Sequence, residues 1–566
     1  MMNATPSACV RRALGAALAA ALCLPAAAQL SYGGLPASDL DSSLTLDPPT
    51  VTMAPVDVER LLLEDSLRDK ASAFRFGDEL SVSFSPETAG VWEQTATGER
   101  VWRLRILSPG AHSLSLIFDQ FELTPGAELY AYNDDRSALY GQYNHLSNQP
   151  NGQFAIQPLP GEALTLELVE PTTIVPSLLN VGTVVHDYRD VFQVLEKQTT
   201  FPTKMAGACN NNVACPEGAP WDNQIRSVAA IFIGGGLCSG AMINNTANDG
   251  TQYFITANHC GGMNNAVFRF NYEFATCNGS GGAPTNQTVQ GSTLMKSGSS
   301  GDYRLIRLNQ QIPSSYNVHF AGWDRSDVAP SNTIAVHHPQ VGPKKISFDF
   351  DPPLKSGIDW RIAQWDDGVT EPGSSGSPLF SNEGLFLGAL FGGQATCSFP
   401  FNDYYPRFSI TSQQLAPWLD PLGTGQLKLP GINAGGTTPP SCGVTKLGES
   451  AGGANVASLD SAGTPDLGAV INAIPNGFAS DTSGVVLLST TLNNTPLAGG
   501  TVFVDHLSPA ASLPFTLSGG AAAVTIQIPS NPALANFTGY AQAAAPDPGQ
   551  PFGWAFTNGL AITFCP

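Results

Sequence analysis

The chain has 566 residues, of which 13% are charged, and its 46 acidic residues outnumber the 26 basic ones to give a net charge of −20. This length predicts two to four domains. The acidic balance argues against a nucleic-acid partner or an anionic membrane surface, since both require clustered Lys and Arg. The 58 glycines and 44 prolines, beside 42% hydrophobic residues, are typical of many short strands and turns.

Residues 1–28 have the pattern of a secretory signal peptide. Arg11 and Arg12 precede a short apolar run at 13–24, and three alanines at 26–28 supply the small residues of a cleavage site. No later apolar run is long enough to span a bilayer. We therefore expect a secreted protein whose mature form has no membrane segment.

Residues 29–204 alternate apolar and polar side chains in several runs, among them 101–106 and 164–168. Such alternation, with Pro and Gly between the runs, predicts a small β-sandwich. The region has no cysteine and carries 24 acidic against 11 basic residues. A cysteine-free region ahead of a cysteine-rich one in an exported chain leaves two interpretations open, a propeptide and an ordinary binding module.

The C-terminal part begins after a stretch at 426–441 that has the Gly, Thr and Pro content of a linker. Residues 442–566 carry further alternating runs, such as 523–528, and predict a second small β-sandwich closed by a Cys442–Cys565 disulfide. Its role stays open among binding to a surface or polymer, assistance in secretion, and removal.

The first of three motifs that together suggest a nucleophilic site is the run FITANHC. In it a predicted strand leads into His259 and Cys260. A bridge from Cys260 to the upstream Cys238 would pin this strand and restrain the imidazole, as a general base needs. Alone, a His beside a Cys is more often structural.

The second motif places Asp302 directly ahead of a predicted strand. There its carboxylate could accept the Nδ1 proton of His259 and fix the tautomer of the ring. Asp324 is an alternative acid, but its neighbours Trp323 and Arg325 favour a surface ion pair.

The third motif is EPGSSGSP at 371–378. Glycines on both sides of Ser375 permit a tight turn that projects its Oγ, and the same turn directs the amides of Gly373 and Ser375 at one point as an oxyanion hole. The chain order His259, Asp302, Ser375 is that of the chymotrypsin-type fold and not of subtilisin or the α/β-hydrolases.

The sequence near these motifs shows no recognisable pattern of metal ligands. His337 and His338 are adjacent, but neighbours on a strand point to opposite faces, and we interpret them as structural. No close CxxC pair suggests zinc. We expect neither a metal nor another cofactor.

Residues 205–425 resemble the secreted bacterial lysyl endopeptidases, a branch of the trypsin-like serine proteases. Beyond the three motifs, the resemblance is carried by CPEG at 215–218, NNTAND at 244–249, AGWDR at 321–325, HHP at 337–339 and GVTEPGSSGSP at 368–378. It implies a chymotrypsin-like double β-barrel with His259, Asp302 and Ser375 in its cleft, acting on proteins and peptides.

Eight cysteines follow the signal peptide, an even number that suggests four disulfides in an oxidising compartment. The resemblance implies three of the pairs: Cys209–Cys397, Cys215–Cys277 and Cys238–Cys260.

Specificity is also inferred from the resemblance. The run NDYYPR at 402–407 matches the stretch in which lysyl endopeptidases carry their pocket Asp, so Asp403 is the candidate for binding a substrate ammonium. A loop Asp paired with Arg407 is the alternative. Val369 occupies the position six residues before Ser375, where other trypsin-like enzymes place an Asp.

Two departures from the family pattern concern the walls of this pocket. Phe391 precedes Gly392 and Gly393 where relatives often have His, and the segment at 345–365 is shorter. Both leave open how strictly Lys is preferred over Arg.

Members of this family mature by cleavage after a Lys that lies a few residues before the first cysteine of the protease domain. In this chain that Lys is Lys204. The resemblance thus implies that residues 29–204 are a propeptide, able to act as an intramolecular inhibitor. We predict a mostly β chain whose central domain is a secreted, monomeric, Lys-directed serine endopeptidase. A protease of broader Arg/Lys or other specificity, and an inactive homologue that only binds, are the alternatives.

Overall fold

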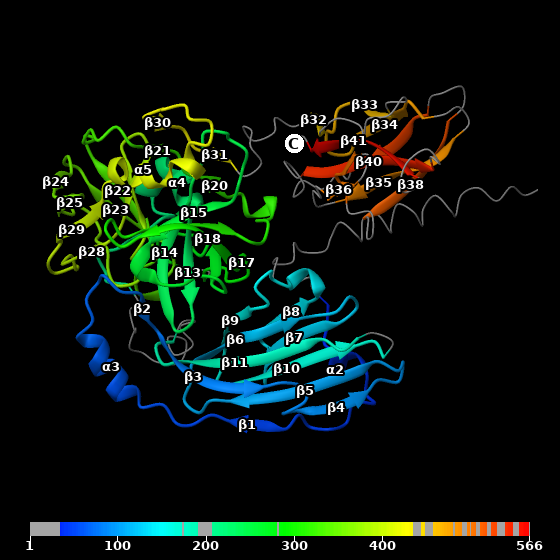
Figure 1. The fold of residues 1–566 in the computed structure, drawn as a ribbon, viewed down its shortest axis with the longest axis horizontal. Coiled ribbons are helices and arrows are strands. Elements are labelled where there is room, and N and C mark those ends of the chain that lie inside the picture. The colour runs from blue at the N-terminus through cyan, green and yellow to red at the C-terminus, as the bar shows by residue number, and fades with distance from the viewer. Residues whose placement is uncertain are drawn as a thin grey trace, which may run out of the picture. The chain divides into compact units, whose positions relative to one another are not determined.

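The structure is a computed structural model that describes most of the chain up to residue 433 and shorter segments beyond it. The described residues are 34–172, 175–190, 206–279, 282–433, 443–447, 457–478, 482–489, 495–497, 500–504, 510–517, 522–528, 538–546 and 554–564. The predicted signal peptide, Lys204, Cys442 and Cys565 lie outside them. The chain divides into two compact units, one from Ala27 to Gly436 and one containing the C-terminal region from Thr437 (Figure 1).

The N-terminal domain is the predicted β-sandwich, drawn in blue and cyan in Figure 1. One sheet holds β1 (Thr50–Thr52), β4 (Val91–Gln94), β5 (Arg100–Leu107), β7 (Glu128–Asn133), β8 (Leu139–Tyr143) and β10 (Ala163–Glu170). The other holds β3 (Gly77–Phe84), β6 (Ser113–Glu122), β9 (Phe154–Pro160) and β11 (Leu178–Asp187). Leu104, Leu166, Leu116 and Val184, from both sheets, are fully buried between them.

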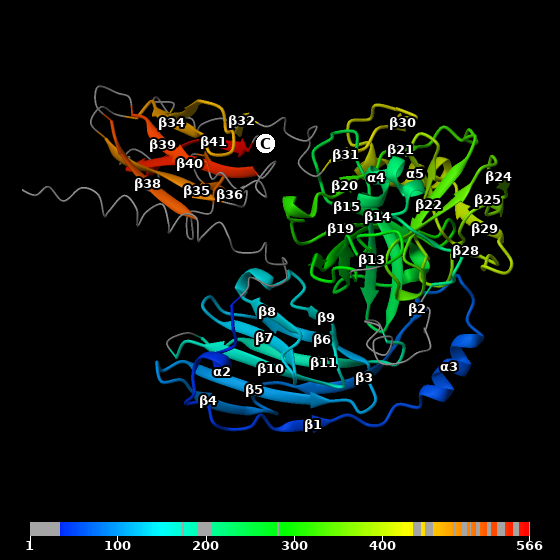
Figure 2. The same ribbon diagram turned by 180° about the vertical axis from the view of Figure 1, so that it is seen from behind.

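The N-terminal domain also contains two helices that the sequence does not predict, α2 (Ala37–Leu40) and α3 (Val58–Ser66). Asp57 caps α3 by accepting a hydrogen bond from the Arg60 amide, and Leu61 is the one buried residue of this helix. A nine-residue helix with so narrow an apolar face gives a weak periodic signal. After α3 the chain continues into β2 (Phe74–Arg75), which joins a sheet of the next domain (Figure 2).

The central domain has the two-barrel architecture that the sequence predicts. Its first sheet contains β13 (Val228–Ile233), β14 (Gly236–Met242), β15 (Tyr253–Ala257), β16 (Val267–Phe270), β17 (Thr288–Gln290), β18 (Ser292–Gly298) and β19 (Tyr303–Leu308). Strand β2 pairs with β14 at its edge.

The second half of the domain is built from two further sheets. One contains β12 (Asn211–Asn212), β21 (Trp323–Asp324), β22 (Thr333–His337), β23 (Lys345–Asp349), β26 (Pro378–Ser381), β27 (Phe386–Ala389) and β30 (Lys428–Leu429). The other contains β24 (Leu354–Ser356), β25 (Asp359–Gln364), β28 (Gly392–Gly393) and β29 (Phe401–Pro406). The central domain also contains helices α4 (Asp222–Ser227) and α5 (Phe408–Leu419). No helix in the described residues is long and apolar enough to cross a membrane.

The predicted linker at 426–441 is wrong in its first part. Strand β30 pairs with β21, and β31 (Ile432–Asn433) pairs with β20 (His319–Phe320). Leu429 is only 3% exposed. The Gly and Thr content suggested a loop, but the apolar residues at 429 and 432 extend the central domain through residue 433.

The C-terminal unit is a second β-sandwich, as predicted. Its larger sheet holds β32 (Gly443–Leu447), β35 (Ser483–Ser489), β38 (Ala511–Thr516), β40 (Thr538–Pro546) and β41 (Trp554–Thr563). The smaller holds β33 (Ser458–Ala462), β34 (Val470–Asn476) and β39 (Val524–Gln527), and β36 (Thr495–Leu497) pairs with β37 (Gly500–Val502). Buried residues from both main sheets, including Leu459, Ile471 and Val486, share one core.

Candidate active site

The loop that carries Ser375 is held against the first barrel by close backbone packing. Gly376 has φ +79°, and a Cβ there would collide with Thr256 Oγ1 and Ser239 O. The Ser239 amide donates to Ser375 O at 2.8 Å, and Ser239 Oγ donates to Gly373 O at 3.0 Å. Only glycine at 376 permits this approach, which fixes Ser375 between the two barrels.

His259 and Asp302 form the pair that the sequence predicts. His259 lies on a short 3₁₀ turn after β15, and its Nδ1 is 2.6 Å from Asp302 Oδ2. The His259 amide donates to Asp302 Oδ1 at 2.8 Å, so the carboxylate holds both ring and backbone. A disulfide between Cys238 and Cys260 ties this turn to β14, and Cys260 Sγ lies 3.8 Å from Ser375 O.

Asp324, the alternative acid, belongs to a different environment. It is buried, and its carboxylate contacts Lys428 Nζ at 3.5 Å. Asp324 thus forms an ion pair, as predicted, but its partner is Lys428, while the neighbouring Arg325 binds Asp420 at 2.7 Å.

Asp403, the predicted pocket residue, lies on β29 and is fully buried. Its Oδ2 accepts from Trp365 Nε1 at 2.8 Å and from Thr370 Oγ1 at 2.7 Å, and the residue has no exposed surface. These two donors turn Oδ1 toward the pocket. The alternative pairing with Arg407 does not occur, since Arg407 binds Asp327 at 2.7 Å.

The pocket is filled by a residue that the sequence analysis missed, Lys70 of the N-terminal domain. Its Nζ lies 2.7 Å from Asp403 Oδ1 and donates to Thr370 O at 2.7 Å, with Ala395 O at 3.4 Å. Burial lowers the pKa of the Lys70 ammonium, and the negative charge of Asp403 opposes that shift. Residues 29–204 contain only three lysines, and this scarcity is the one sequence signal that could have drawn attention to Lys70.

The backbone of Lys70 passes directly by the serine. Ser375 Oγ donates to Lys70 O at 2.9 Å. In the described part of the chain, His259 Nε2 is buried and has no hydrogen-bond partner. The serine hydroxyl is thus engaged by the N-terminal domain and not by the imidazole.

The predicted wall residues Phe391, Gly392 and Gly393 all border this site. The Phe391 ring stands edge-on to His259, with ring centroids 6.2 Å apart. A Cβ on Gly393 would collide with Asn402 O and with the Asp403 carboxylate. A Cβ on Gly392 would lie 3.1 Å from the Ala71 amide nitrogen.

His337 contacts the loop that carries Ser375. Its Nδ1 lies 2.7 Å from Ser374 Oγ and its Nε2 lies 3.1 Å from Ser347 Oγ. Burial lowers the pKa of His337 to about 3, so the ring is neutral near pH 7. His338 is equally buried, and its Nδ1 is 3.1 Å from Gly342 O.

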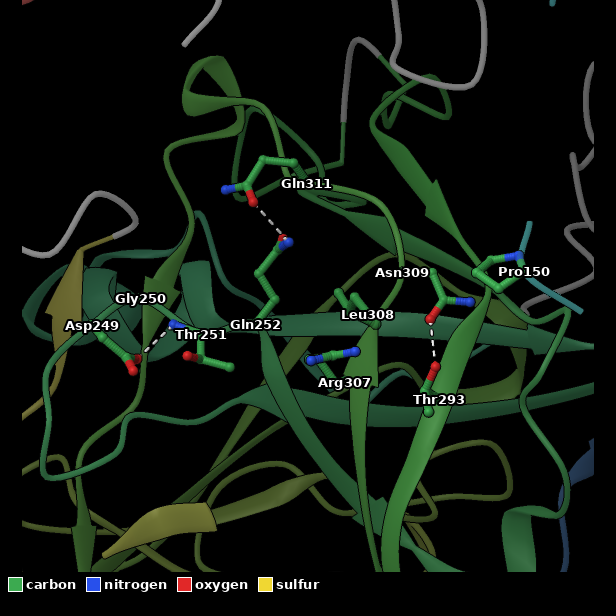
Figure 3. A pocket seen from close by; sticks show the side chains of 10 residues that line it. All are labelled: Pro150, Asp249, Gly250, Thr251, Gln252, Thr293, Arg307, Leu308, Asn309 and Gln311. Carbon is green, nitrogen blue, oxygen red and sulfur yellow. Dashed lines mark hydrogen bonds between the residues drawn. The ribbon is translucent and has the colours of Figure 1, made fainter. Parts of the chain in front are cut away.

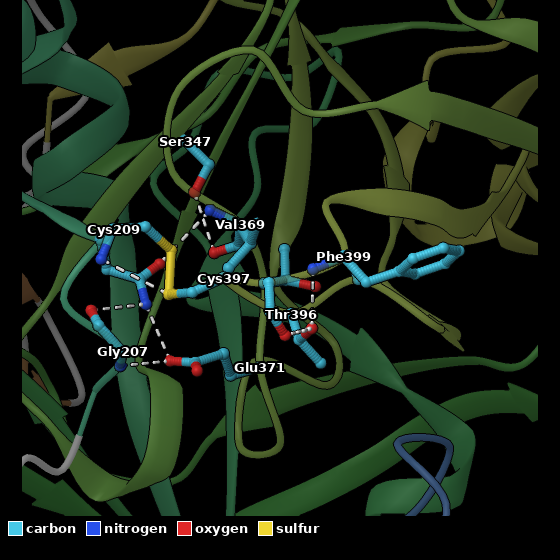
Figure 4. Close-up of a disulfide and its surroundings, with 12 residues drawn as sticks. Gly207, Cys209, Ser347, Val369, Glu371, Thr396, Cys397 and Phe399 are labelled. Carbon is cyan, nitrogen blue, oxygen red and sulfur yellow. Dashed lines mark hydrogen bonds between the residues drawn. A yellow bond between two sulfur atoms is a disulfide. The ribbon is translucent and has the colours of Figure 1, made fainter.

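Three disulfides are present, between the pairs that the family resemblance implies: Cys209–Cys397, Cys215–Cys277 and Cys238–Cys260. Figure 4 shows the surroundings of the first. Beside it, Glu371 of the serine loop accepts from the Gly207 amide at 2.8 Å and from Asn210 Nδ2 at 2.7 Å. The start of the central domain is therefore tied to the loop that carries Ser375.

A hollow of about 420 Å³ lies elsewhere on the domain, along β18 and β19 (Figure 3). Its polar groups bond one another, as in the pairs Thr293–Asn309 and Gln252–Gln311. None of the site residues described above lines it.

Comparison with known proteins gives a family match and curated relatives. Residues 203–406 match the model of the family "Lysyl endopeptidase, C-terminal domain". A lysyl endopeptidase of Pseudomonas aeruginosa is 26% identical over 364 residues, covering 58% of this chain and 77% of the relative.

Solved structures with some likeness include a Glu endopeptidase (14% identity, 38% of this chain, 98% of that chain, TM-score 0.28). Another is a serine endoprotease from Yersinia pestis (11% identity, 55% of this chain, 97% of that chain, TM-score 0.26). The family match covers the serine loop, His259, Asp302 and Asp403 in one stretch. The central region of the chain is therefore similar to the lysyl endopeptidases.

Proposed function

We propose that the chain is a secreted endopeptidase that hydrolyses peptide bonds on the carboxyl side of lysine. The observation that carries this proposal is the Lys70 side chain in the Asp403 pocket, beside Ser375. The ammonium of a lysine is bound there while the carbonyl of the same residue lies at the nucleophile. A bound lysine substrate would place its own carbonyl in the same neighbourhood.

Ser375, His259 and Asp302 would perform acyl transfer. Asp302 holds His259 through Nδ1, which leaves Nε2 to take the Ser375 proton as Oγ attacks the carbonyl carbon. The amides of Gly373 and Ser375 would stabilise the oxyanion. His259 then returns the proton to the leaving amine, and a water molecule hydrolyses the acyl-enzyme by the reverse sequence of proton transfers.

The pocket chemistry favours lysine over arginine. Three oxygen acceptors, from Asp403, Thr370 and Ala395, converge on one nitrogen. That arrangement matches the three donors of an ammonium, whereas a guanidinium is planar, is larger and spreads its donors over three nitrogens.

Maturation and secretion belong to the same proposal. Cleavage after Lys204 would separate residues 29–204 from the protease domain, and the enzyme itself has the specificity to make this cut. The signal-like N-terminus and the three disulfides support an oxidising, extracellular destination.

The test is to purify the matured protein, sequence its N-terminus and map its cuts in a denatured protein by mass spectrometry. The Ser375→Ala variant serves as the control preparation. We expect cuts concentrated after Lys, a mature N-terminus at Met205, and labelling of Ser375 by a fluorophosphonate. Cuts spread equally over Lys and Arg would instead support the broader specificity, and no cuts and no labelling would support an inactive binding homologue.

A further inference from the structure

The segment between α3 and β2 runs through the cleft in the manner of a bound peptide. Lys70 fills the pocket, and Ala71 lies against Gly392. Two internal hydrogen bonds shape the segment: Ser72 Oγ donates to Asp69 O at 2.8 Å, and Arg68 Nη2 donates to Ala73 O at 3.0 Å. We call residues 68–73 the latch segment.

The latch segment is bound in a geometry that disfavours its own cleavage. Ser375 Oγ gives its hydrogen to Lys70 O, whereas attack requires that hydrogen to go to His259 Nε2. Among the backbone hydrogen bonds of the described residues, none joins the Gly373 or Ser375 amide to Lys70 O. The carbonyl therefore lacks both the general base and the oxyanion donors that hydrolysis needs.

The downstream side of the latch segment is anchored by strand addition. Strand β2 pairs antiparallel with β14, Phe74 opposite Leu237 and Arg75 opposite Gly236. The Phe76 and Gly77 amides then both donate to Gly235 O. Backbone pairing of this kind binds a peptide independently of its side chains, so it fixes the register that places Lys70 in the pocket.

The upstream side is anchored to the N-terminal domain through one carboxylate. Asp65, near the end of α3, binds Arg75 Nε at 2.7 Å, Arg189 Nη2 at 2.6 Å and the Tyr188 hydroxyl at 2.7 Å. These contacts join both ends of the latch segment to the last strand region of the sandwich.

The two domains also share buried contacts away from the latch segment. Phe76 packs edge-on against Phe232 with ring centroids 5.9 Å apart, within a core common to both domains. The buried Arg269 donates to Gln157 Oε1 at 2.9 Å. None of these contacts depends on the covalent connection between the domains.

From these observations, and resting on the proposed function, we propose that the latch segment is a built-in competitive inhibitor with Lys70 as its anchor. A cut after Lys204 alone then leaves the cleft closed. Activity appears only when the N-terminal domain is released or degraded.

The experiment uses the full chain with Lys204→Gln, which blocks the proposed processing site, and measures how fast a fluorophosphonate labels Ser375 in the full-length band. Lys70→Met removes the ammonium and keeps the length of the side chain. Labelling should accelerate by about tenfold or more in Lys70→Met. Arg60→Ala, which removes an exposed cation from α3, is the matched control and should label like the parent chain.

A second measurement requires no substitution in the latch segment. The full-length chain is treated with an amine-acetylating reagent and each lysine is followed by mass spectrometry. Lys70 should be protected, whereas Lys355, whose side chain is 48% exposed, should react. Equal modification of both lysines, or equal labelling rates with and without Lys70, overturns the proposal.

The two proposals fail in different ways. If the released protease domain cuts after Lys but Lys70→Met labels no faster than the parent chain, only the latch is wrong. If neither full-length nor released protein labels at Ser375, the proposed function is wrong as well. In a third experiment, a cleavage site for an unrelated protease is inserted near residue 204 in a chain that keeps Lys70. If cutting at this site at once allows full labelling of Ser375, the latch proposal is wrong.

Discussion

Replacing Asp403 by Asn is the sharpest test of the pocket. In the structure Oδ2 accepts from Trp365 and Thr370, and Oδ1 faces the ammonium. An asparagine would keep its carbonyl oxygen toward the two donors, because only an oxygen can accept them. Its NH₂ group would then face the pocket, where it opposes a cation donor to donor.

The expected magnitude follows from the burial of the pair. Lys70 Nζ and Asp403 Oδ1 are 2.7 Å apart, with side-chain exposures of 6% and 0%. Removing one partner of such a buried pair costs about 3–5 kcal/mol. For a lysine substrate bound in the same way, kcat/KM should fall by about 150- to 5,000-fold.

The assay compares fluorogenic peptides that differ only in lysine, arginine or norleucine before the scissile bond. The variants are matured at an inserted site for an unrelated protease, freed of the N-terminal domain and normalised by fluorophosphonate titration. The lysine peptide should lose most of its advantage, while the norleucine peptide, with no charge, should change only a few-fold. Asp366→Asn, the same change at an exposed carboxylate, is the matched control.

An equal loss of kcat/KM on the lysine and norleucine peptides would show that Asp403 maintains the fold of the cleft and does not recognise the charge of the substrate. Unchanged kcat/KM values on both peptides would refute the assignment of this pocket altogether.

Three further predictions follow. Thr370→Val removes one donor to Asp403, and kcat/KM on the lysine peptide should fall about 5- to 30-fold with little change for norleucine; an equal loss on both would contradict this. Burial raises the pKa of Asp349 to about 7 in the folded protein, above its value of about 4 in the unfolded chain. The free energy of unfolding therefore decreases as the pH rises from about 4 to 7, and the full loss is present above pH 7. Asp349→Asn in an inactive Ser375→Ala background should therefore raise the free energy of unfolding by about 1–3 kcal/mol at pH 8 and by little at pH 4 in urea titrations; an equal gain at both pH values would refute it. Residues 447–566 contain no Lys or Arg, so prolonged incubation of the mature enzyme should yield no fragment ending within them, as read by intact-mass spectrometry.

The triad pair and the serine loop could be predicted because their determinants are local. Gly376 is conspicuous in sequence, and the structure shows why it is needed: the loop meets the backbone of β14 there. His259 follows a strand that a nearby disulfide restrains, and Asp302 precedes the strand that pairs with it. Short-range sequence patterns were therefore enough to predict these residues, whereas the pocket position of Asp403 was predicted from the family resemblance.

The latch could not be predicted because nothing near Lys70 marks it. Its partner Asp403 is 333 positions away, and the contact exists only because β2 adds to the edge of a sheet in another domain. The segment around it is polar and lacks the alternation of a strand. The boundary at residue 426 failed for a related reason, since two-residue strands such as β30 are recognised by their pairing partner and not by their own pattern.

The chemistry of the pocket explains why one lysine could regulate the enzyme. A carboxylate with no exposed surface is costly unless it is paired, and Asp403 is paired with Lys70 while the domains remain joined. The latch segment therefore fills the pocket and also neutralises its charge. Under the two proposals, release of the N-terminal domain would leave this carboxylate unpaired and would favour binding of a substrate lysine, so inhibition and specificity would both follow from one buried charge.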